Sequence, residues 1–451
     1  MSAADSASEP MQPTAPGSRE PMDRAAARVH GWCDPRLRRV REVFTEHFTQ
    51  GEEAGASACV YLGDDLAVEL WGGVADVRTG RPWQRDTPCV AFSCTKALTA
   101  TCALRLWQEG AYDVDGPVTA WWPEFGRHGK DRATAAHLLS HQVGLPAFDT
   151  PVSVAETTDP AALAERLAAQ APVWEPGTAH GYHALTFGWL AGEIVRRLSG
   201  QTVGEYIARH IAGPHQLDIW LGPPDDVIER AARLTARKPG PPDPPARTKT
   251  KDDAKRLPRA GITRAAAGMP VGTAADAAAP GGAPGAEALA RMNAALGDQS
   301  SLLFRSFSIP DTRSVPGGSN NPDVMRAGWP ASGALVTAPG LAGFYRQLIA
   351  GRILEPATLR SALVPRARGA DRLLLIESSF GLGFMRPAWT FPTPPAGAES
   401  AFGHTGIGGA IGLADPRHGI AMAYIPNRMG DETSGGLRAY RLVEAVYDSI
   451  A

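Results

Sequence analysis

The sequence predicts an α+β fold in which an antiparallel sheet is flanked by helices and a mostly helical region is interposed between its strands. Two observations lead to this prediction. Strand-like runs occur near both ends of the 451-residue chain, whereas the stretch from about 111 to 329 has mainly helical patterns. The first strands also follow one another directly, without the helix of a βαβ unit. We therefore expect an α/β region made of residues 31–110 and 330–451, with the helical region between these two segments.

The chain opens with residues 1–30, which we expect to form a disordered tail because they are rich in Ser, Ala, Pro and Glu. Asp34 followed by Pro35 is the pattern of a helix N-cap with proline at the first helical position, and an apolar stripe at helical spacing follows. Two strand-like runs come next, at 56–62 and 66–73, and the short Gly-Asp-Asp segment between them predicts a hairpin. The folded domain is thus expected to begin with a helix and two antiparallel strands.

The middle of the chain reads mostly as helix, up to about Leu221. Its clearest helical segments are 162–170, 185–198 and 203–210. The stretch 238–285 is rich in Pro, Gly and Ala and cannot bury a large apolar surface, so we interpret it as a long insertion or flap that is partly flexible.

The sheet is expected to return in the last third of the chain. The turn sequence Asp-Pro-Arg-His-Gly at 415–419 separates the final two strand-like runs. The strand-like runs are 380–384, 409–413 and 420–425, and the expected helices of this part are 288–296, 340–350 and 437–450.

Charge and cysteine content narrow the class of protein. The chain has 45 Lys and Arg against 47 Asp and Glu, so it lacks the basic surface that nucleic acid or an anionic membrane requires. Its first residues contain no apolar stretch typical of a signal peptide or a membrane anchor. Five cysteines, an odd number without a Cys-x-x-Cys pair, favour reduced thiols. We therefore expect a cytoplasmic protein that acts on a small molecule, with an oligomeric state that composition does not indicate.

One short motif indicates a candidate catalytic site. Ser93 and Lys96 are three residues apart at the start of an apolar helical run, so the hydroxyl and the amine lie on one helix face. A desolvated lysine has a lowered pKa and can take the proton of the serine hydroxyl. The free N–H groups of the same helix N-terminus can bind the oxyanion that forms on attack. The competing interpretation is a solvated helix face, because Ser-x-x-Lys alone is a common pattern.

Three further stretches accompany Ser93-Cys94-Thr95-Lys96 in the chain order of a known family. They are HLLSHQVGLP at 137–146, WEPG at 174–177 followed by Tyr182, and HTG at 404–406. Together these motifs resemble the serine β-lactamase and penicillin-binding-protein superfamily, most closely its class C β-lactamase-like branch, which includes the family VIII carboxylesterases. The resemblance extends from about Asp34 to the C-terminus, apart from the insertion, and implies a β-lactamase-like fold.

The resemblance implies a role for each matching residue. Ser93 is the nucleophile, and Lys96 and Tyr182 share the base and acid roles. Tyr182 is expected to have a lowered pKa, so that its phenol takes the serine proton and later activates water. The backbone N–H of Ile407 joins that of Ser93 in the oxyanion hole. The alternative for Tyr182 is a core tyrosine at the start of a helix.

Two positions depart from the family pattern and bear on the substrate. Ala184 replaces the amide that in β-lactamases holds the acylamino side chain of the substrate. His404, with Thr405 and Gly406, replaces Lys-Thr-Gly, so a mostly neutral imidazole stands where the family has a fixed positive charge. Both departures favour neutral esters over anionic amides, with this strand orienting the substrate.

Three other histidines and a tryptophan are weaker candidates. His183, beside Tyr182, is expected to line the mouth of the substrate pocket, with a solvated or packing role as the open alternative. Trp329, in a loop before the returning sheet, is expected near the acyl pocket. His137 and His141 are four residues apart on a helix, but no carboxylate completes a zinc motif, which favours a structural role. The mechanism implied by the resemblance needs no metal and no cofactor.

The sequence therefore predicts an enzyme that hydrolyses small-molecule carboxylic esters through an acyl-serine intermediate. Three alternatives stay open. A β-lactamase or D-alanyl peptide hydrolase is disfavoured by Ala184, by His404 and by the expected lack of an export signal. An acyltransferase would use the same site with an alcohol as acceptor. A binding protein with this fold and no activity is disfavoured because Ser93, Lys96 and Tyr182 are retained together.

Overall fold

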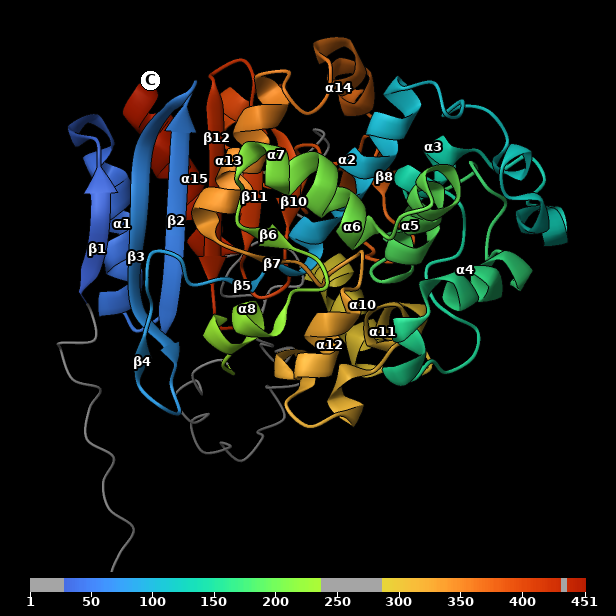
Figure 1. The fold of residues 1–451 in the computed structure, drawn as a ribbon, viewed down its shortest axis with the longest axis horizontal. Coiled ribbons are helices and arrows are strands. Elements are labelled where there is room, and N and C mark those ends of the chain that lie inside the picture. The colour runs from blue at the N-terminus through green and yellow to red at the C-terminus, as the bar shows by residue number, and fades with distance from the viewer. Residues whose placement is uncertain (1–27, 237–285, 431–435) are drawn as a thin grey trace, which may run out of the picture.

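The computed structural model describes residues 28–236, 286–430 and 436–451. Figure 1 shows an antiparallel sheet with helices packed on it at one side of the molecule, and a helical region beside it. The α+β class expected from the sequence is therefore confirmed. The insertion expected at 238–285 lies outside the described residues.

The large sheet is built from both ends of the chain. Its strand order is β1-β3-β2-β12-β11-β10, and every neighbouring pair is antiparallel. The central pair joins N-terminal β2 to C-terminal β12, where Ala58 lies opposite Tyr424. The strands are β1 (Val29–Cys33), β2 (Gly55–Leu62), β3 (Asp65–Asp76), β10 (Phe402–Thr405), β11 (Ile411–Asp415) and β12 (Ile420–Pro426), and β4 (Arg81–Pro82) pairs with β3.

Helices cover both faces of this sheet. α1 (Arg38–Thr49) and α15 (Leu437–Ile450) contact each other, and α13 (Ala338–Ile349) contacts β2, β11 and β12. In Figure 1, α13 lies in front of the sheet and α1 and α15 lie behind it. The sheet is thus buried on both faces, which explains why β12 is buried along its whole length.

α2 (Thr95–Gln108) lies between the sheet and the helical region. It is buried on nearly all sides, and its buried residues include the polar side chains of Thr95, Lys96, Thr99 and Thr101. Its main helical neighbour is α5 (Thr186–Ser199). The remaining helices are α3 (Ala135–Leu139), α4 (Pro160–Ala169), α6 (Val203–Ile207), α7 (Gly213–His215), α8 (Asp225–Arg230), α10 (Ala286–Gly297), α11 (Leu302–Ser308), α12 (Pro322–Ala327) and α14 (Pro356–Leu363).

Two small sheets position the segments around α2. β5 (Cys89–Val90) and β6 (Ile219–Trp220) both pair with β7 (Leu335–Val336), and β5 leads directly into the turn before α2. β8 (Ala367–Ala370) pairs with β9 (Glu377–Phe380) as a separate ribbon. The segment between β8 and β9 contains Asp371, whose side chain accepts hydrogen bonds from the backbone of Tyr182.

Two local expectations are wrong. Val29 and His30 belong to strand β1, paired with Gly72 and Trp71, so these two residues are not part of the tail expected at residues 1–30, of which 1–27 lie outside the described residues. The strand expected at 380–384 stops at Phe380, because the following residues turn away to bond to other segments. Gly383 there has a φ of 80°, a conformation that favours glycine and ends the extended run.

Two further observations concern the whole described chain. None of its helices within 28–236, 286–430 and 436–451 is long and apolar enough to cross a membrane. All five cysteines are free thiols, and burial raises the pKa of the four that are buried: Cys59, Cys89, Cys94 and Cys102. These four thiols are therefore protonated at neutral pH.

Candidate active site

Ser93 lies in the turn that leads into α2. Phe92–Cys94 form one 3-10 turn, and α2 begins at Thr95. Phe92 has a left-handed φ of 46°, and its carbonyl accepts a hydrogen bond of 2.6 Å from Thr95 Oγ1. A left-handed conformation is costly for a residue other than glycine, so the turn before the serine is strained. Ser93 itself is half-buried and remains accessible.

Lys96 is fully buried, with its amine beside Ser93. Its Nζ lies 3.1 Å from Ser93 Oγ, 2.7 Å from the carbonyl oxygen of Ala184 and 3.1 Å from that of Ala331. Burial lowers the pKa of Lys96 well below its ordinary value, because removal from water disfavours the charged form. The amine therefore loses its proton far more readily than an exposed lysine.

The neutral amine fits these three contacts. It has two N–H groups and one lone pair, whereas a carbonyl oxygen can only accept. Once Ala184 and Ala331 accept the two N–H groups, the lone pair of Lys96 is left for the hydroxyl of Ser93. This is the arrangement of a general base with its nucleophile.

Tyr182 completes the relay. Its side chain is hydrogen-bonded to that of Ser93, and its ring lies 4.9 Å from Lys96 Nζ. Burial raises the pKa of Tyr182, and the hydrogen bond to Ser93 lowers it only in part. The expected lowering of this pKa is therefore wrong: the phenol is protonated. With the phenol protonated and Lys96 neutral, the Tyr182 O–H can donate to Ser93 Oγ and the Ser93 O–H can donate to Lys96 Nζ.

Strand β10 brings His404, Thr405 and Gly406 next to the Ser93 turn. The thiol of Cys94 donates to the carbonyl oxygen of His404 at 3.2 Å. A Cβ on Gly406 would lie 2.5 Å from the carbonyl oxygen of Ala91, so only glycine allows this close approach. Gly406 N donates to Ala410 O at 2.7 Å and closes the turn that contains Ile407. The predicted substrate strand and the predicted nucleophile thus lie side by side.

His404 is buried and neutral. Its Nδ1–H donates to the carbonyl oxygen of Thr405 at 2.8 Å, so Nε2 carries a lone pair. Among the described residues, no group forms a hydrogen bond with this Nε2. Burial lowers the pKa of His404 to about 3, with the nearby Lys96 acting in the same direction. His404 therefore offers an acceptor, and no positive charge, near the ring of Tyr182 at 6.1 Å.

His183 and Trp329 have structural positions. His183 Nε2 accepts from Leu145 N at 3.0 Å, and its Nδ1–H donates to Gly181 O at 2.6 Å. Both ring nitrogens therefore bind the backbone of loops that frame the site, and the substrate contact expected of His183 stays a prediction. The ring of Trp329 is buried and packs 6.2 Å from that of Trp189. Two residues after Trp329, the carbonyl oxygen of Ala331 accepts a hydrogen bond from Lys96.

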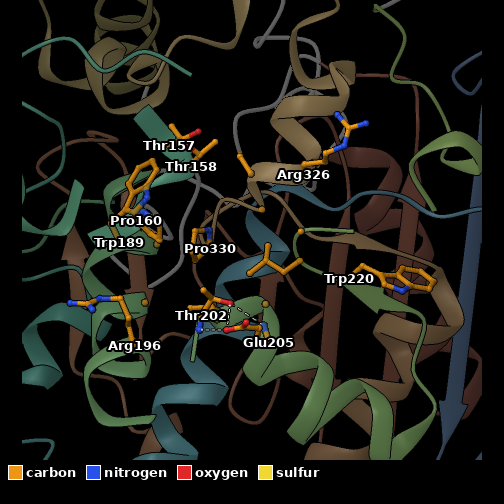
Figure 2. A pocket seen from close by; sticks show the side chains of 18 of the residues that line it. Thr157, Thr158, Pro160, Trp189, Arg196, Thr202, Glu205, Trp220, Arg326 and Pro330 are labelled. Atoms are coloured by element: carbon orange, nitrogen blue, oxygen red, sulfur yellow. Dashed lines mark hydrogen bonds between the residues drawn. The ribbon is translucent and has the colours of Figure 1, made fainter. Parts of the chain in front are cut away.

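The loop 328–331, which contains Trp329, separates Lys96 from a cavity. Pro330 O accepts a hydrogen bond of 2.6 Å from Thr99 Oγ1, and Ala331 O accepts from Lys96. On its other side lies a cavity of about 680 Å³ between α5, α6, β6 and α12 (Figure 2). Charged residues of its lining pair with each other, as Arg196 does with Glu193. None of the residues assigned to the site from the sequence lines this cavity.

Sequence reasoning missed two contributors to the site. The buried Asp371 accepts hydrogen bonds from Tyr182 N at 3.2 and 3.1 Å. Helix α11 places Ser306 Oγ where it accepts from Ala184 N at 3.3 Å, and the ring of Phe307 lies 6.1 Å from that of Tyr182. An aspartate in a turn-like loop and a short helix next to a low-complexity stretch carry no local pattern that indicates these contacts.

The histidines considered for metal binding hold loops instead. His137 Nδ1 accepts from Thr134 N at 3.3 Å in a capping box, and His141 Nδ1 accepts from His183 N at 3.1 Å. In the part of the chain that the structure describes, no three or more His, Cys, Asp or Glu side chains are grouped so that they could hold a metal ion.

Comparison with known proteins identifies the family of the chain. A model of the Beta-lactamase family matches residues 40–447. The chain is 30% identical over 414 residues to Esterase/beta-lactamase LipL of Mycobacterium tuberculosis, covering 90% of this chain and 84% of that protein.

Two solved structures share the fold over almost the whole chain. A penicillin-binding-protein homolog from Caulobacter crescentus superposes with a TM-score of 0.74 at 33% identity, covering 94% of this chain and 100% of the other. A family VIII carboxylesterase superposes with a TM-score of 0.75 at 29% identity, with the same coverage. The chain therefore belongs to the beta-lactamase family and is a hydrolase with the serine β-lactamase fold.

Proposed function

We propose that the protein hydrolyses carboxylic esters of small molecules through an acyl-serine intermediate on Ser93. The observation that carries the proposal is the relay from Tyr182 through Ser93 to Lys96. The amine of Lys96 has both N–H groups engaged with carbonyls, and its lone pair is available to the serine hydroxyl. Such an arrangement activates a hydroxyl without a histidine or a metal.

In the acylation step, Lys96 takes the proton of Ser93 as Oγ attacks the ester carbonyl carbon. The carbonyl oxygen becomes an oxyanion, which the backbone N–H groups of Ser93 and Ile407 would stabilise by a few kcal/mol. When the tetrahedral intermediate collapses, the C–O bond to the alcohol breaks. The proton on Lys96 passes to the alcohol oxygen, directly or through Tyr182. Water then attacks the acyl group with the same residues as base, and Ser93 is released.

Two features of the site support esters over β-lactams. His404 is neutral, so the position that holds a lysine in the family offers no charge to a substrate carboxylate. Ala184 has no side-chain amide, and its backbone N–H is bonded to Ser306. The names of the relatives include esterase and carboxylesterase, but also beta-lactamase, so a chromogenic cephalosporin is the second substrate to assay.

The test is hydrolysis of a short-chain p-nitrophenyl ester by the wild type and by Ser93→Ala, with mass spectrometry of the Ser93 peptide. We expect an acyl adduct in the wild type and a loss of activity of roughly 10⁴-fold or more in the variant. Equal rates in both proteins and no adduct would contradict the proposal. Addition of an alcohol, with measurement of the new ester, separates a hydrolase from an acyltransferase.

A further inference from the structure

A buried aspartate holds the main chain of the proposed acid–base residue. Asp371 follows β8, and its side chain is almost inaccessible at 1% exposure. Tyr182 N donates to Oδ1 at 3.2 Å and to Oδ2 at 3.1 Å. Leu373 N and Leu374 N each donate to Oδ1 at 2.8 Å. The carboxylate therefore closes its own loop and ties the segment that carries Tyr182 to it.

Two further hydrogen bonds, made through Ser378 and His180, orient the carboxylate of Asp371. Ser378 Oγ donates to Asp371 Oδ2 at 2.9 Å, and His180 Nε2 lies 3.0 Å from Ser378 Oγ. Because the serine proton is used toward the carboxylate, His180 Nε2–H donates to the serine oxygen. Arg372 N also donates to His180 O at 3.0 Å. The loop after β8 thus fixes both residues that flank Gly181.

The cost of this arrangement calls for a reason beyond loop closure. A buried carboxylate is expensive to remove from water, and burial accordingly raises the pKa of Asp371, while the N–H of Leu374 and the nearby His180 lower it. An uncharged turn residue could close a loop of this length at lower cost. The carboxylate oxygens accept the N–H of Tyr182, so they fix the backbone of this residue. The phenol on that backbone has to stay within hydrogen-bond distance of Ser93.

We propose that Asp371, oriented by Ser378 and His180, is a positioning residue that fixes the backbone of Tyr182 and so holds its phenol on Ser93. The inference rests on the proposed function of this site. Loss of the anchor should let the phenol drift, and displacements of about 1 Å in an active site cost on the order of 10²-fold in rate.

Asp371→Asn tests this, because the amide nitrogen replaces one of the two oxygens that accept from Tyr182 N. The matched control is Asp415→Asn. Asp415 is equally buried, accepts from the phenol of Tyr447 at 2.7 Å, and lies at the end of β11. Each substitution is made in the wild type and in Tyr182→Phe.

Three quantities are measured for each protein: kcat and KM for the p-nitrophenyl ester, and the rate at which a fluorophosphonate labels Ser93. We expect Asp371→Asn to lower kcat and the labelling rate roughly 10- to 100-fold with little change in KM, and by less than about 3-fold when Tyr182 is already Phe. Asp415→Asn should change neither rate by more than about 3-fold in either background. An equal loss from Asp371→Asn in both backgrounds would overturn the proposal, since the aspartate would then not act through the phenol.

A spectroscopic measurement removes the dependence on turnover. The chain has only 8 tyrosines, so their Cζ carbons can be followed by ¹³C NMR, with Tyr182 assigned by its loss in Tyr182→Phe. Asp371→Asn should shift the Tyr182 signal, whereas Asp415→Asn should shift that of Tyr447. An unmoved Tyr182 signal would overturn the proposal.

The outcomes separate this inference from the proposed function. The wild type could be inactive toward esters while Asp371→Asn still slows the labelling of Ser93 and shifts the Tyr182 signal. That result would refute ester hydrolysis and support the positioning role of Asp371. If Asp371→Asn does not fold, Ser378→Ala takes its place in the same comparison. It removes one hydrogen bond from the carboxylate, and a loss of about 3- to 10-fold that disappears in Tyr182→Phe is expected.

Discussion

Two lysines in this chain are buried in the same manner, in different regions. Lys96 lies between the sheet and the helical region, and Lys130 lies within the helical region beside α4. Both are 0% exposed, and each amine donates to two backbone carbonyls. Each also lies over an aromatic ring, at 4.9 Å from Tyr182 for Lys96 and 5.3 Å from Phe125 for Lys130.

The difference between them is the third contact. Lys96 meets the hydroxyl of Ser93, whereas the carbonyls of Arg127 and Gln170 are the only hydrogen-bond acceptors of Lys130 within the described ranges. Burial lowers the pKa of both lysines, to about 8 for Lys130. Burial therefore suffices to lower the pKa of a lysine, and what distinguishes Lys96 is the hydroxyl of Ser93 beside its amine.

The largest effect expected from this comparison is on activity. Lys96→Met removes the base and should slow acylation roughly 10³- to 10⁴-fold, since general-base catalysis contributes on that scale. Lys130→Met should leave the rate within about 3-fold. Release of p-nitrophenol in a single turnover measures both, with circular dichroism to check the fold. Similar losses of acylation rate in the two variants would contradict the assignment of Lys96 as the general base.

Tyr182→Phe should come next, with a loss of roughly 10²- to 10³-fold in kcat. The ring keeps its stacking on Phe380, with centroids 6.0 Å apart, so the loss reports the phenolic O–H. Tyr112→Phe is the matched control, because that buried phenol donates to a backbone carbonyl, Ala103 O, at 3.1 Å. Steady-state kinetics on both variants decide whether the hydroxyl or the packing matters.

A smaller effect is expected at the loop that presents Ala331. Thr99→Ala leaves Pro330 O without its hydrogen bond, which should cost about 1–3 kcal/mol of unfolding free energy and lower kcat about 3- to 10-fold as the Ala331 carbonyl moves. Thr101, two residues further along α2, donates to Ala97 O, which belongs to the same helix. Thr101→Ala should therefore leave kcat within about 2-fold. Urea unfolding and steady-state kinetics on the pair test whether the loop and Lys96 are coupled.

The smallest effect concerns stability at alkaline pH. The folded pKa of Lys130 is lowered from 10.5 to about 8, so between these values the unfolded chain binds a proton that the folded chain has lost. The free energy of unfolding therefore rises with pH in this window, by up to about 1.4 kcal/mol per pH unit for one group. Lys130→Met should reduce that slope, as measured by urea unfolding at several pH values. An unchanged slope would show that Lys130 titrates normally.

The parts of this site that the sequence predicts are those with local patterns. The three-residue spacing of Ser93 and Lys96 puts them on one helix face, and the runs of β2, β11 and β12 are continuous and apolar. The motif before Tyr182 predicts its place at the site, and in the structure its side chain is hydrogen-bonded to that of Ser93.

The parts that the sequence does not predict depend on distant contacts. The two carbonyls that receive Lys96 come from residues 88 and 235 positions away. The pKa of Tyr182 is raised because its surroundings exclude water, and no local pattern encodes that burial. His183, adjacent to Tyr182 in sequence, binds loop backbone through both ring nitrogens, which tertiary packing and no local pattern decides.

The central claim is that Lys96 is neutral when Ser93 attacks. The most direct test is the pH dependence of Ser93 acylation by a p-nitrophenyl ester in single-turnover stopped-flow measurements, with wild type and Tyr182→Phe compared. Because the pKa of Lys96 is lowered, we expect the acylation rate to fall only at low pH and to reach a plateau well below pH 10.5 in both proteins. A rate that keeps rising about tenfold per pH unit up to that value would show a lysine with an ordinary pKa and would contradict the account.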